Sequence, residues 1–186
     1  MARTRSEQSR RAILESALSL ARSGGYGKLT VDAVAAAAGV GKQTIYRWWR
    51  SLGEVVLDTL REHAKSLPAP ETGSLEGDLT AFLGATFRLQ RGPNGTAEVL
   101  RGLMAEAQLD DGFAPSFAEF IEARRAVLRS IVLRHVPAAR GSEAEATVDM
   151  LFGAMWYRML VKHGPLDSAF AQTLAALAAR QHGEKR

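Results

Sequence analysis

Apolar residues recur every three or four positions along most of the chain, a period that predicts amphipathic α-helices. The first helix is expected over residues 6–23, and a glycine-rich stretch at 24–27 ends it. Beyond residue 50, helices are expected at residues 51–67, 75–91, 96–109, 115–135, 148–161 and 167–181. With the two short helices described next, the pattern predicts an all-α fold of about nine helices.

Residues 30–49 predict two short helices around one glycine. Thr30 is suited to cap the first, because its hydroxyl can accept a bond from a free backbone N–H of the first turn. Gly39 ends that helix, because glycine adopts left-handed backbone angles without a Cβ clash. Ala35 lies four residues before this glycine and Ile45 lies six after it. The spacing is typical of a helix-turn-helix, whose second helix enters the DNA major groove.

The segment 148–161 has a different pattern, since only Asp149 and Arg158 are charged and apolar residues occupy every face. A helix that is apolar all round must be buried on several sides. We therefore expect a second chain to cover part of it; the alternative is a central core helix packed beside an amphipathic one. The side chains expected between the two chains are Leu151, Met155, Met159, Phe170, Leu174 and Leu177.

The composition fits a small globular protein of one or two domains, with 46% apolar residues among 186. There is no cysteine, which excludes disulfides, thiolate metal sites and a cysteine nucleophile. The chain opens on a polar, arginine-rich stretch, and no apolar run approaches the roughly 20 residues of a membrane span. We expect a cytoplasmic protein with no membrane partner.

Basic residues are concentrated at the N-terminal end. Residues 1–50 hold nine Lys/Arg and three Asp/Glu, a net charge of +6, whereas residues 51–186 hold 15 and 17, a net charge of −2. A charge imbalance alone would fit a solvated basic surface. Because this excess coincides with the helix-turn-helix, it favours a polyanionic partner for the N-terminal part.

Nothing in the sequence predicts catalysis. The four histidines, at 63, 135, 163 and 182, are far apart and lack the His-x-x-x-His spacing of metal sites. The chain also lacks a Gly-x-Ser-x-Gly nucleophile elbow. We expect no enzyme activity, no metal and no cofactor.

Three N-terminal segments resemble the TetR family of bacterial transcriptional regulators, and this resemblance covers residues 6–66. The segments are Arg11–Leu20, the Gly-Tyr-Gly-Lys-Leu-Thr-Val stretch ending at Val31, and Val34–Trp49. The C-terminal part is similar to one group of the family through Leu100–Ala107 and through Gly153–Leu160 with the following Gly164–Asp167.

The resemblance implies a DNA-binding domain at residues 1–50, a connecting helix at 51–67, and an effector-binding and dimerisation domain at 74–186. It implies a homodimeric repressor that a small ligand releases from a palindromic, double-stranded DNA operator. Two-fold symmetry would place the two reading helices roughly 34–36 Å apart, one DNA turn. The alternative is a DNA-binding regulator that answers to a protein partner or to no effector.

Carried over residue by residue, the DNA contacts of the family fall on Thr30, Lys42, Gln43, Thr44, Tyr46, Arg47 and Trp48. The chemistry agrees, because Gln can bond adenine, Arg can bond guanine, and the Thr methyl can contact thymine. A solvated helix face is the alternative interpretation.

The two tryptophans present a choice. The general helix-turn-helix count makes Trp48 the buried residue, whereas the family match buries Trp49 and turns Trp48 toward the DNA backbone. The family often has a lysine where Leu52 stands, so one phosphate contact is in doubt.

The effector site is expected among aromatic and methionine side chains, although such a stripe is also typical of a plain core. The candidates are Phe82, Phe87, Met104, Phe117, Phe120, Met150, Trp156 and Tyr157. Their character favours an apolar or aromatic effector.

Overall fold

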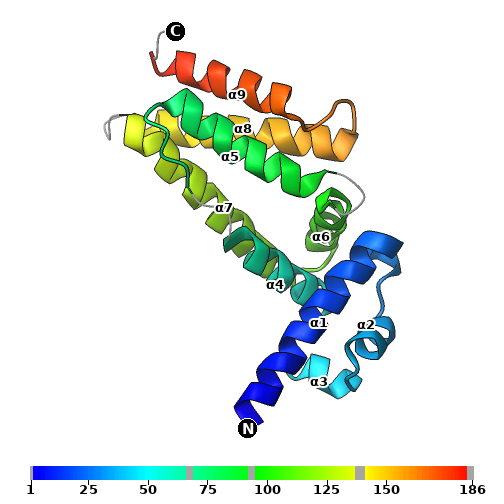
Figure 1. Cartoon of the computed structure of the whole chain (residues 1–186). Helices are drawn as coiled ribbons and strands as arrows, with labels where there is room; N and C mark the ends of the chain where they lie inside the picture. Colours follow the sequence, from blue (N-terminus) through cyan, green and yellow to red (C-terminus); the bar gives the residue numbers. More distant parts are fainter. Residues whose placement is uncertain (1, 66–68, 92–94, 137–140, 184–186) are drawn as a thin grey trace. The chain divides into compact units, whose positions relative to one another are not determined.

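The computed structural model describes residues 2–65, 69–91, 95–136 and 141–183, with side chains from Ser6 onward. These residues form α-helices and one 3₁₀-helix with no strand among them, which confirms the predicted all-α fold. The helices are α1 (Ala2–Gly24), η1 (Tyr26–Lys28), α2 (Val31–Ala38), α3 (Lys42–Tyr46), α4 (Leu52–Lys65), α5 (Leu75–Gln90), α6 (Ala97–Leu109), α7 (Ala114–His135), α8 (Gly141–Val161) and α9 (Ser168–Gln181) (Figure 1).

The largest difference from the predicted helix limits is at α8, which begins at Gly141 instead of residue 148. Ala144 and Thr147 are buried, so the first two turns already face the core. The Thr147 hydroxyl donates to the Glu143 carbonyl one turn earlier, at 2.8 Å.

Two compact units divide the chain, one formed by residues 1–65 and 92–120 and the other by residues 66–91 and 121–186. We call them unit 1 and unit 2. The predicted domain boundary near residue 74 groups the chain differently, because it assigns α6 to the C-terminal part. By packing, α6 belongs with the N-terminal helices.

Close contact between α6 and η1 explains this grouping. A Cβ at position 102 of α6 would lie 2.4 Å from Cδ1 of Tyr26, so only glycine allows this approach. The Tyr26 hydroxyl also donates to the Glu106 carboxylate. Burial raises the pKa of Tyr26 well above its ordinary value, and the hydrogen bond and negative charge of Glu106 raise it further.

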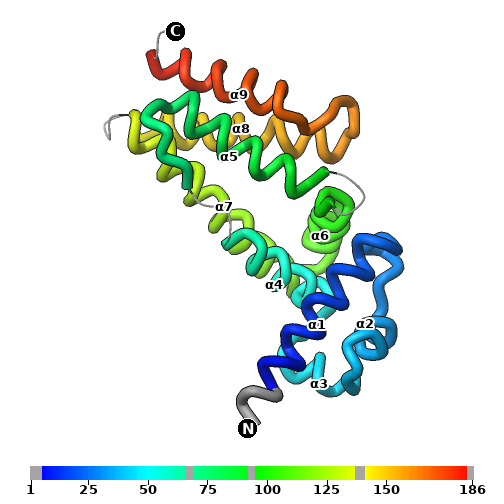
Figure 2. The backbone as a smooth tube through the Cα atoms, viewed as in Figure 1, coloured from blue at the N-terminus to red at the C-terminus, as the bar shows by residue number. Residues whose placement is uncertain are grey.

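The core of unit 1 forms where α1 and α4 face each other, with α2 and α3 together on one side of α1 (Figure 2). Buried Thr59 is satisfied, because its hydroxyl donates to the carbonyls of Leu14, at 3.2 Å, and Val55, at 3.0 Å. The apolar side chains buried on the two helices are Ile13, Leu14, Ala17, Leu18, Ala21, Val55, Val56, Leu57 and Leu60.

In unit 2, α9 packs along α5 (Figure 1). Phe87 of α5 stacks on Phe170 of α9, with ring centroids 5.9 Å apart. Gln90, also on α5, lies with Nε2 3.5 Å from the sulfur of Met155 on α8. The buried face of α9 consists of small residues, which let this helix approach closely: Ala171, Ala175, Ala176, Ala178 and Ala179.

Among the described residues of unit 2, one charged side chain is buried, the carboxylate of Asp78. It accepts bonds from the backbone N–H and the hydroxyl of Thr72, at 2.5 and 2.8 Å. Arg134, at 3.0 Å, and His135, at 2.8 Å, approach its other oxygen. Burial alone would raise the pKa of Asp78, but these hydrogen bonds outweigh burial and hold it below its ordinary value. The cluster ties the segment before α5 to the end of α7.

No helix of the described part of the chain is both long and apolar enough to cross a membrane. The same residues contain no group of three or more His, Cys, Asp or Glu side chains arranged to hold a metal ion.

Candidate nucleic-acid interface

The ends of α2 are set by the two residues that the sequence indicates. Thr30 has extended backbone angles, and its Oγ1 accepts from the N–H of Ala33 at 3.2 Å. Gly39 has φ of 65° and ψ of 33°, in the left-handed region, and its N–H donates to the Ala36 carbonyl at 3.2 Å. The N–H of Val40 donates to the Ala35 carbonyl at 3.0 Å and completes the stop. Both predicted helix-end roles are confirmed.

The short helix α3 is held from its inner side. Ile45 is buried within it, and Val34 and Ala35 are buried on α2. Just beyond its end, Trp49 is 5% exposed and Trp48 is 40% exposed. The buried tryptophan is therefore Trp49, as the family match implies, and the general helix-turn-helix count is wrong for this pair.

Asp58 of α4 fixes the buried tryptophan, a role that no sequence pattern indicated. Its Oδ2 accepts from the Trp49 indole N–H at 2.9 Å and from Arg10 of α1 at 3.2 Å. Its other oxygen accepts from Arg61 at 3.2 Å. The Arg10 guanidinium also lies 5.9 Å from the centre of the Trp49 ring. One carboxylate thus connects α1, α4 and the end of α3, which holds α3 against the core of unit 1.

The start of α4 has a capping box in a modified form. The Ser51 hydroxyl accepts from the N–H of Glu54 at 3.2 Å. The Glu54 carboxylate accepts in return from the N–H of Arg50 at 2.7 Å, one residue earlier than in the usual pattern. The expected start is correct to one residue.

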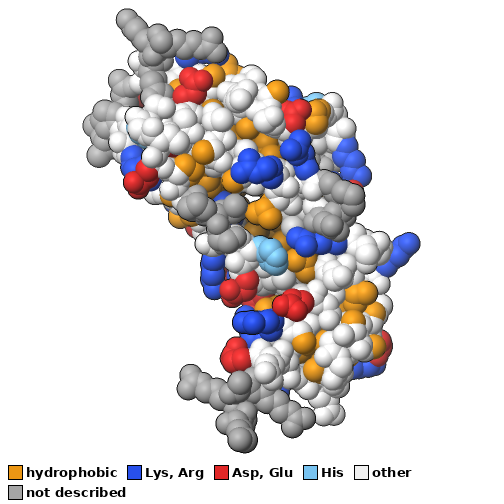
Figure 3. Space-filling view, in the orientation of Figure 1, with side chains coloured by type: hydrophobic (Ala, Val, Ile, Leu, Met, Phe, Trp, Pro, Cys, Tyr) orange, Lys and Arg blue, Asp and Glu red, His pale blue; other side chains and the backbone are white. Residues whose placement is uncertain are grey.

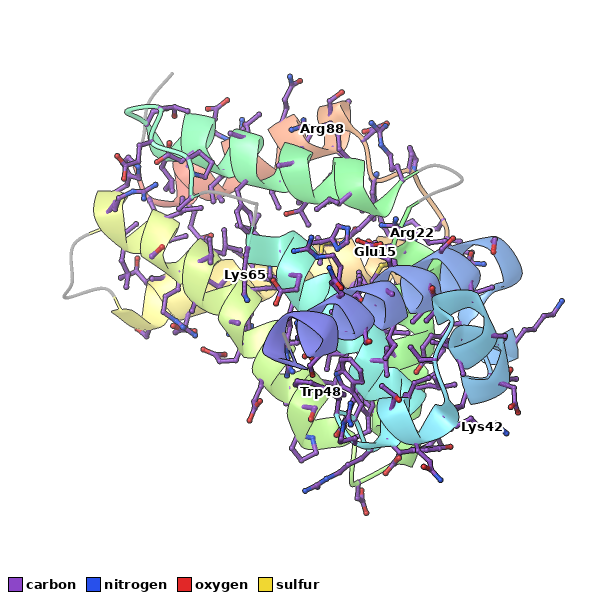
Figure 4. All side chains as sticks on the ribbon, turned by 60° about the horizontal axis from the view of Figure 1, so that its bottom comes forward. Glu15, Arg22, Lys42, Trp48, Lys65 and Arg88 are labelled. Atoms are coloured by element: carbon purple, nitrogen blue, oxygen red, sulfur yellow. The ribbon has the colours of Figure 1, made fainter. Side chains whose placement is uncertain are left out.

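The outer side of α3 is polar and exposed. Gln43, Tyr46 and Arg47 are exposed, and Thr44 is half-buried between them and the core. Lys42 begins the helix and Trp48 follows it, and Figure 4 shows both beside α3. We call the seven predicted DNA-contacting residues the reading face: Thr30, Lys42, Gln43, Thr44, Tyr46, Arg47 and Trp48.

The reading face offers mostly hydrogen-bond donors and positive charge. The Lys, Arg, Tyr and Trp groups can donate to phosphate oxygens, and the Gln amide and the Arg guanidinium fit base edges in a major groove. The Lys42 ammonium lies 2.5 Å from the Asp32 carboxylate, which raises the pKa of Lys42 and keeps it protonated. Figure 3 shows basic and acidic side chains interspersed on the visible side of the N-terminal helices. The basic excess is therefore not one continuous patch there.

The predicted effector residues are not brought together in one unit. Phe82 and Phe87 are buried on α5 of unit 2, and Trp156 of α8 is half-buried. Met104, Phe117 and Phe120 belong to unit 1. Met150 and Tyr157 are exposed on α8, because they lie two turns apart on its outward side. Neither of these two lines the interior of unit 2.

The predicted dimer residues are also divided by the structure. Leu151, Met155 and Met159 are buried inside unit 2, because they recur every fourth residue on the inward side of α8. Phe170 and Leu174 are half-buried, and Leu177 is exposed. The large apolar side chains that α8 exposes are Met150, Tyr157, Leu160 and Val161, and α9 exposes Leu177; we call these five residues the α8 outer face.

Two family models match the chain. Residues 13–58 match the model of bacterial regulatory proteins of the tetR family, and residues 69–178 match the tetracyclin repressor-like C-terminal domain. The first match contains the whole reading face. The second extends over most of unit 2 and also α6.

Relatives and solved structures agree with these matches. An uncharacterised HTH-type transcriptional regulator, YdeS of Bacillus subtilis, is 29% identical over 92% of this chain and 88% of its own. The crystal structure of the TetR family transcription regulator SCO0332 is 30% identical and has a TM-score of 0.72, covering 92% of this chain and 97% of its own. The multidrug binding protein EbrR complexed with ethidium has the same fold, with a TM-score of 0.65 at 23% identity, covering 92% and 98%. The chain belongs to the TetR family of transcriptional regulators.

Proposed function

We propose that this regulator is a homodimeric repressor that binds a palindromic operator and is released from it by a small apolar ligand. The observation that carries the proposal is the reading face, whose exposed donors lie mostly on or directly after α3, a helix held from its inner side by Ile45 and the Trp49–Asp58 bond. A rigid helix with outward donors is what direct readout of a major groove requires.

Within this proposal, some residues of the reading face contact bases and others contact the DNA backbone. Arg47 and Gln43 contact base edges, because their side chains can make two parallel bonds to guanine and adenine. Thr30, Lys42 and Tyr46 contact phosphates, and the Trp48 indole N–H donates to the DNA backbone. Thr44 is closest to the core and presents its methyl group to a thymine.

The α8 outer face supports the homodimer. Four of its five side chains lie on one helix and span about three turns, and all five are large and apolar. An exposed apolar surface of this kind marks a protein interface. A second copy of the chain is the partner that a palindromic operator requires, because a two-fold axis pairs identical surfaces.

Unit 2 supports a ligand response. It holds Phe82 and Phe87 in its interior, and the Arg124 guanidinium lies 5.2 Å from the centre of the Phe82 ring. EbrR, which shares the fold, binds ethidium. We propose that the effector contacts Phe82, Phe87 and Trp156, and that Met104, Phe117 and Phe120 serve the packing of unit 1.

Selection from a pool of random DNA duplexes tests the proposal. The protein should enrich a palindrome whose half-site centres lie about 10 base pairs apart. Arg47→Ala should fail to enrich it, whereas Arg88→Ala, which removes an exposed arginine from α5, should enrich it normally. Absence of any enriched sequence would contradict a sequence-specific repressor.

A thermal-shift screen of aromatic compounds, with ethidium included, tests the ligand. At least one compound should both stabilise the protein and weaken its binding to the selected duplex, because a ligand that binds only one state shifts the equilibrium toward it. If compounds stabilise the protein but leave its DNA affinity unchanged, release by a small ligand is contradicted, and control by a protein partner is favoured.

A further inference from the structure

Asp32 is out of place on a surface that binds a polyanion. It is the only acidic residue between positions 26 and 50, a stretch that holds four basic residues. It occupies the first turn of α2, two residues after Thr30, so it lies at the edge of the reading face. A carboxylate there would repel DNA phosphates.

The Asp32 carboxylate is paired with a residue of the reading face. Its Oδ1 lies 2.5 Å from Nζ of Lys42, the first residue of α3. The pair therefore bridges the two helices of the helix-turn-helix. The side chains remain 71% and 55% exposed, respectively, so a phosphate could reach either group.

Such an exposed ion pair adds little to the stability of the fold, because water and salt screen it. Its consequence for DNA is larger. Sequence-independent affinity comes from the Lys and Arg groups that neutralise phosphates and release counterions. A lysine already held by a carboxylate must exchange that partner for phosphate, so it contributes less than a full contact.

We propose that Asp32 limits the sequence-independent part of DNA affinity by engaging Lys42 and by repelling the phosphate that would replace it. The inference rests on the proposed DNA-binding function of the reading face. It assigns to Asp32 a tuning role: Asp32 reduces the time that the protein spends on DNA of any sequence, and Lys42 is the group through which it acts.

The experiment compares Asp32→Asn with Glu15→Gln on a random-sequence duplex, by fluorescence anisotropy over a range of monovalent salt. Both variants remove one negative charge from unit 1 and so raise its net charge by one. Glu15 is exposed on α1, and Figure 4 shows it on the other side of α1 from Lys42. Asp32→Asn should steepen the plot of log affinity against log salt by about 0.9 per chain, and tighten binding roughly eightfold at 0.1 M salt. Glu15→Gln should change both quantities much less.

A double-mutant cycle with Lys42→Met tests whether Asp32 changes DNA affinity through its ion pair with Lys42. In the wild-type background, Lys42→Met should weaken binding less than twofold. In the Asp32→Asn background, it should reverse most of the gain. The two changes should therefore be strongly non-additive, as expected for groups in direct contact.

The outcomes separate this inference from the proposed function. If the wild type shows no salt-dependent binding to any duplex, the proposed function is wrong. If the wild type binds but Asp32→Asn behaves like Glu15→Gln, or if the cycle is additive, the role of Asp32 is refuted. Thermal unfolding of each variant shows whether α2 still folds, and Asp32→Ser, a residue tolerated in a first helical turn, provides a second test of the same prediction.

Discussion

Two regions of the molecule expose large apolar side chains, and their surroundings differ. At the end of α3, Tyr46 and Trp48 are exposed next to Lys42, Arg47 and Arg50. On the α8 outer face, large apolar residues are exposed over about three turns next to one another. The exposed rings at the end of α3 lie beside positively charged side chains, whereas the α8 outer face is predominantly apolar.

Exposure of a large side chain does not by itself identify the partner that covers it. Tyr and Trp beside basic groups can donate to phosphates and still cover apolar surface, which suits nucleic acid. On the α8 outer face the Met, Leu and Val side chains offer no donors and Tyr157 adds a single hydroxyl, so this face suits another apolar surface. The same property of two helices thus points to DNA for α3 and to a second chain for α8.

The largest expected effect is on the α8 outer face. Leu160→Glu would bury an unpaired carboxylate in a dimer interface, which costs several kcal/mol, so the dimer dissociation constant should rise by roughly 100-fold or more. Analytical ultracentrifugation measures this. The matched control is Leu133→Glu on α7, because Leu133 is 41% exposed and Leu160 is 46% exposed. Equal dissociation by both variants, or by neither, would remove the α8 outer face from the interface.

The next largest effect is on DNA affinity, through a change in the reading face. Arg47→Ala should weaken binding to the selected duplex by roughly 10- to 100-fold, because one bidentate base contact contributes about 1–3 kcal/mol. The change should leave the dimer intact and the thermal midpoint unchanged, since Arg47 is exposed. Titration of labelled duplex provides the measurement. A variant that binds as tightly as the wild type would show that Arg47 faces solvent in the complex.

The smallest expected effect is on the free energy of unfolding, when the residue that caps α2 is changed. Thr30→Ala removes the cap of α2 and should lower the free energy of unfolding by about 1 kcal/mol. Thr173→Ala is the control, because this exposed hydroxyl donates to the carbonyl one turn earlier in its own helix and caps no helix end. Urea titrations compare the two variants. If Thr30→Ala unfolds like the control, α2 is held by packing alone.

Local chemistry explains why the ends of α2 and the buried side of α3 were predictable. Each of these features depends on residues close by in the sequence. They are the cap formed by the Thr30 hydroxyl, the left-handed backbone of Gly39 and the apolar side chain of Ile45. Such effects can be inferred from sequence without knowledge of distant contacts. The Trp49–Asp58 bond was missed because the two residues lie on different elements and no local sequence pattern links them.

The C-terminal part was less predictable for the same physical reason. An α8 that is apolar on every side gives no indication of which stripe faces its own core, so Met155 and Met159 were assigned to a partner chain although they are buried within unit 2. The grouping of α6 with unit 1 depends on Gly102 and Tyr26, which are 76 residues apart. Only the folded chain shows such pairs.

Hydrogen–deuterium exchange of the protein with and without the selected duplex tests the central claim, that α3 binds DNA and the α8 outer face binds a second chain. The account predicts that DNA slows exchange at residues 42–48 and leaves residues 157–161 unchanged, because the dimer already covers them. Dilution below the dimer dissociation constant, without DNA, should speed exchange at residues 157–161 alone. Protection by DNA at residues 157–161 with none at residues 42–48 would contradict the account.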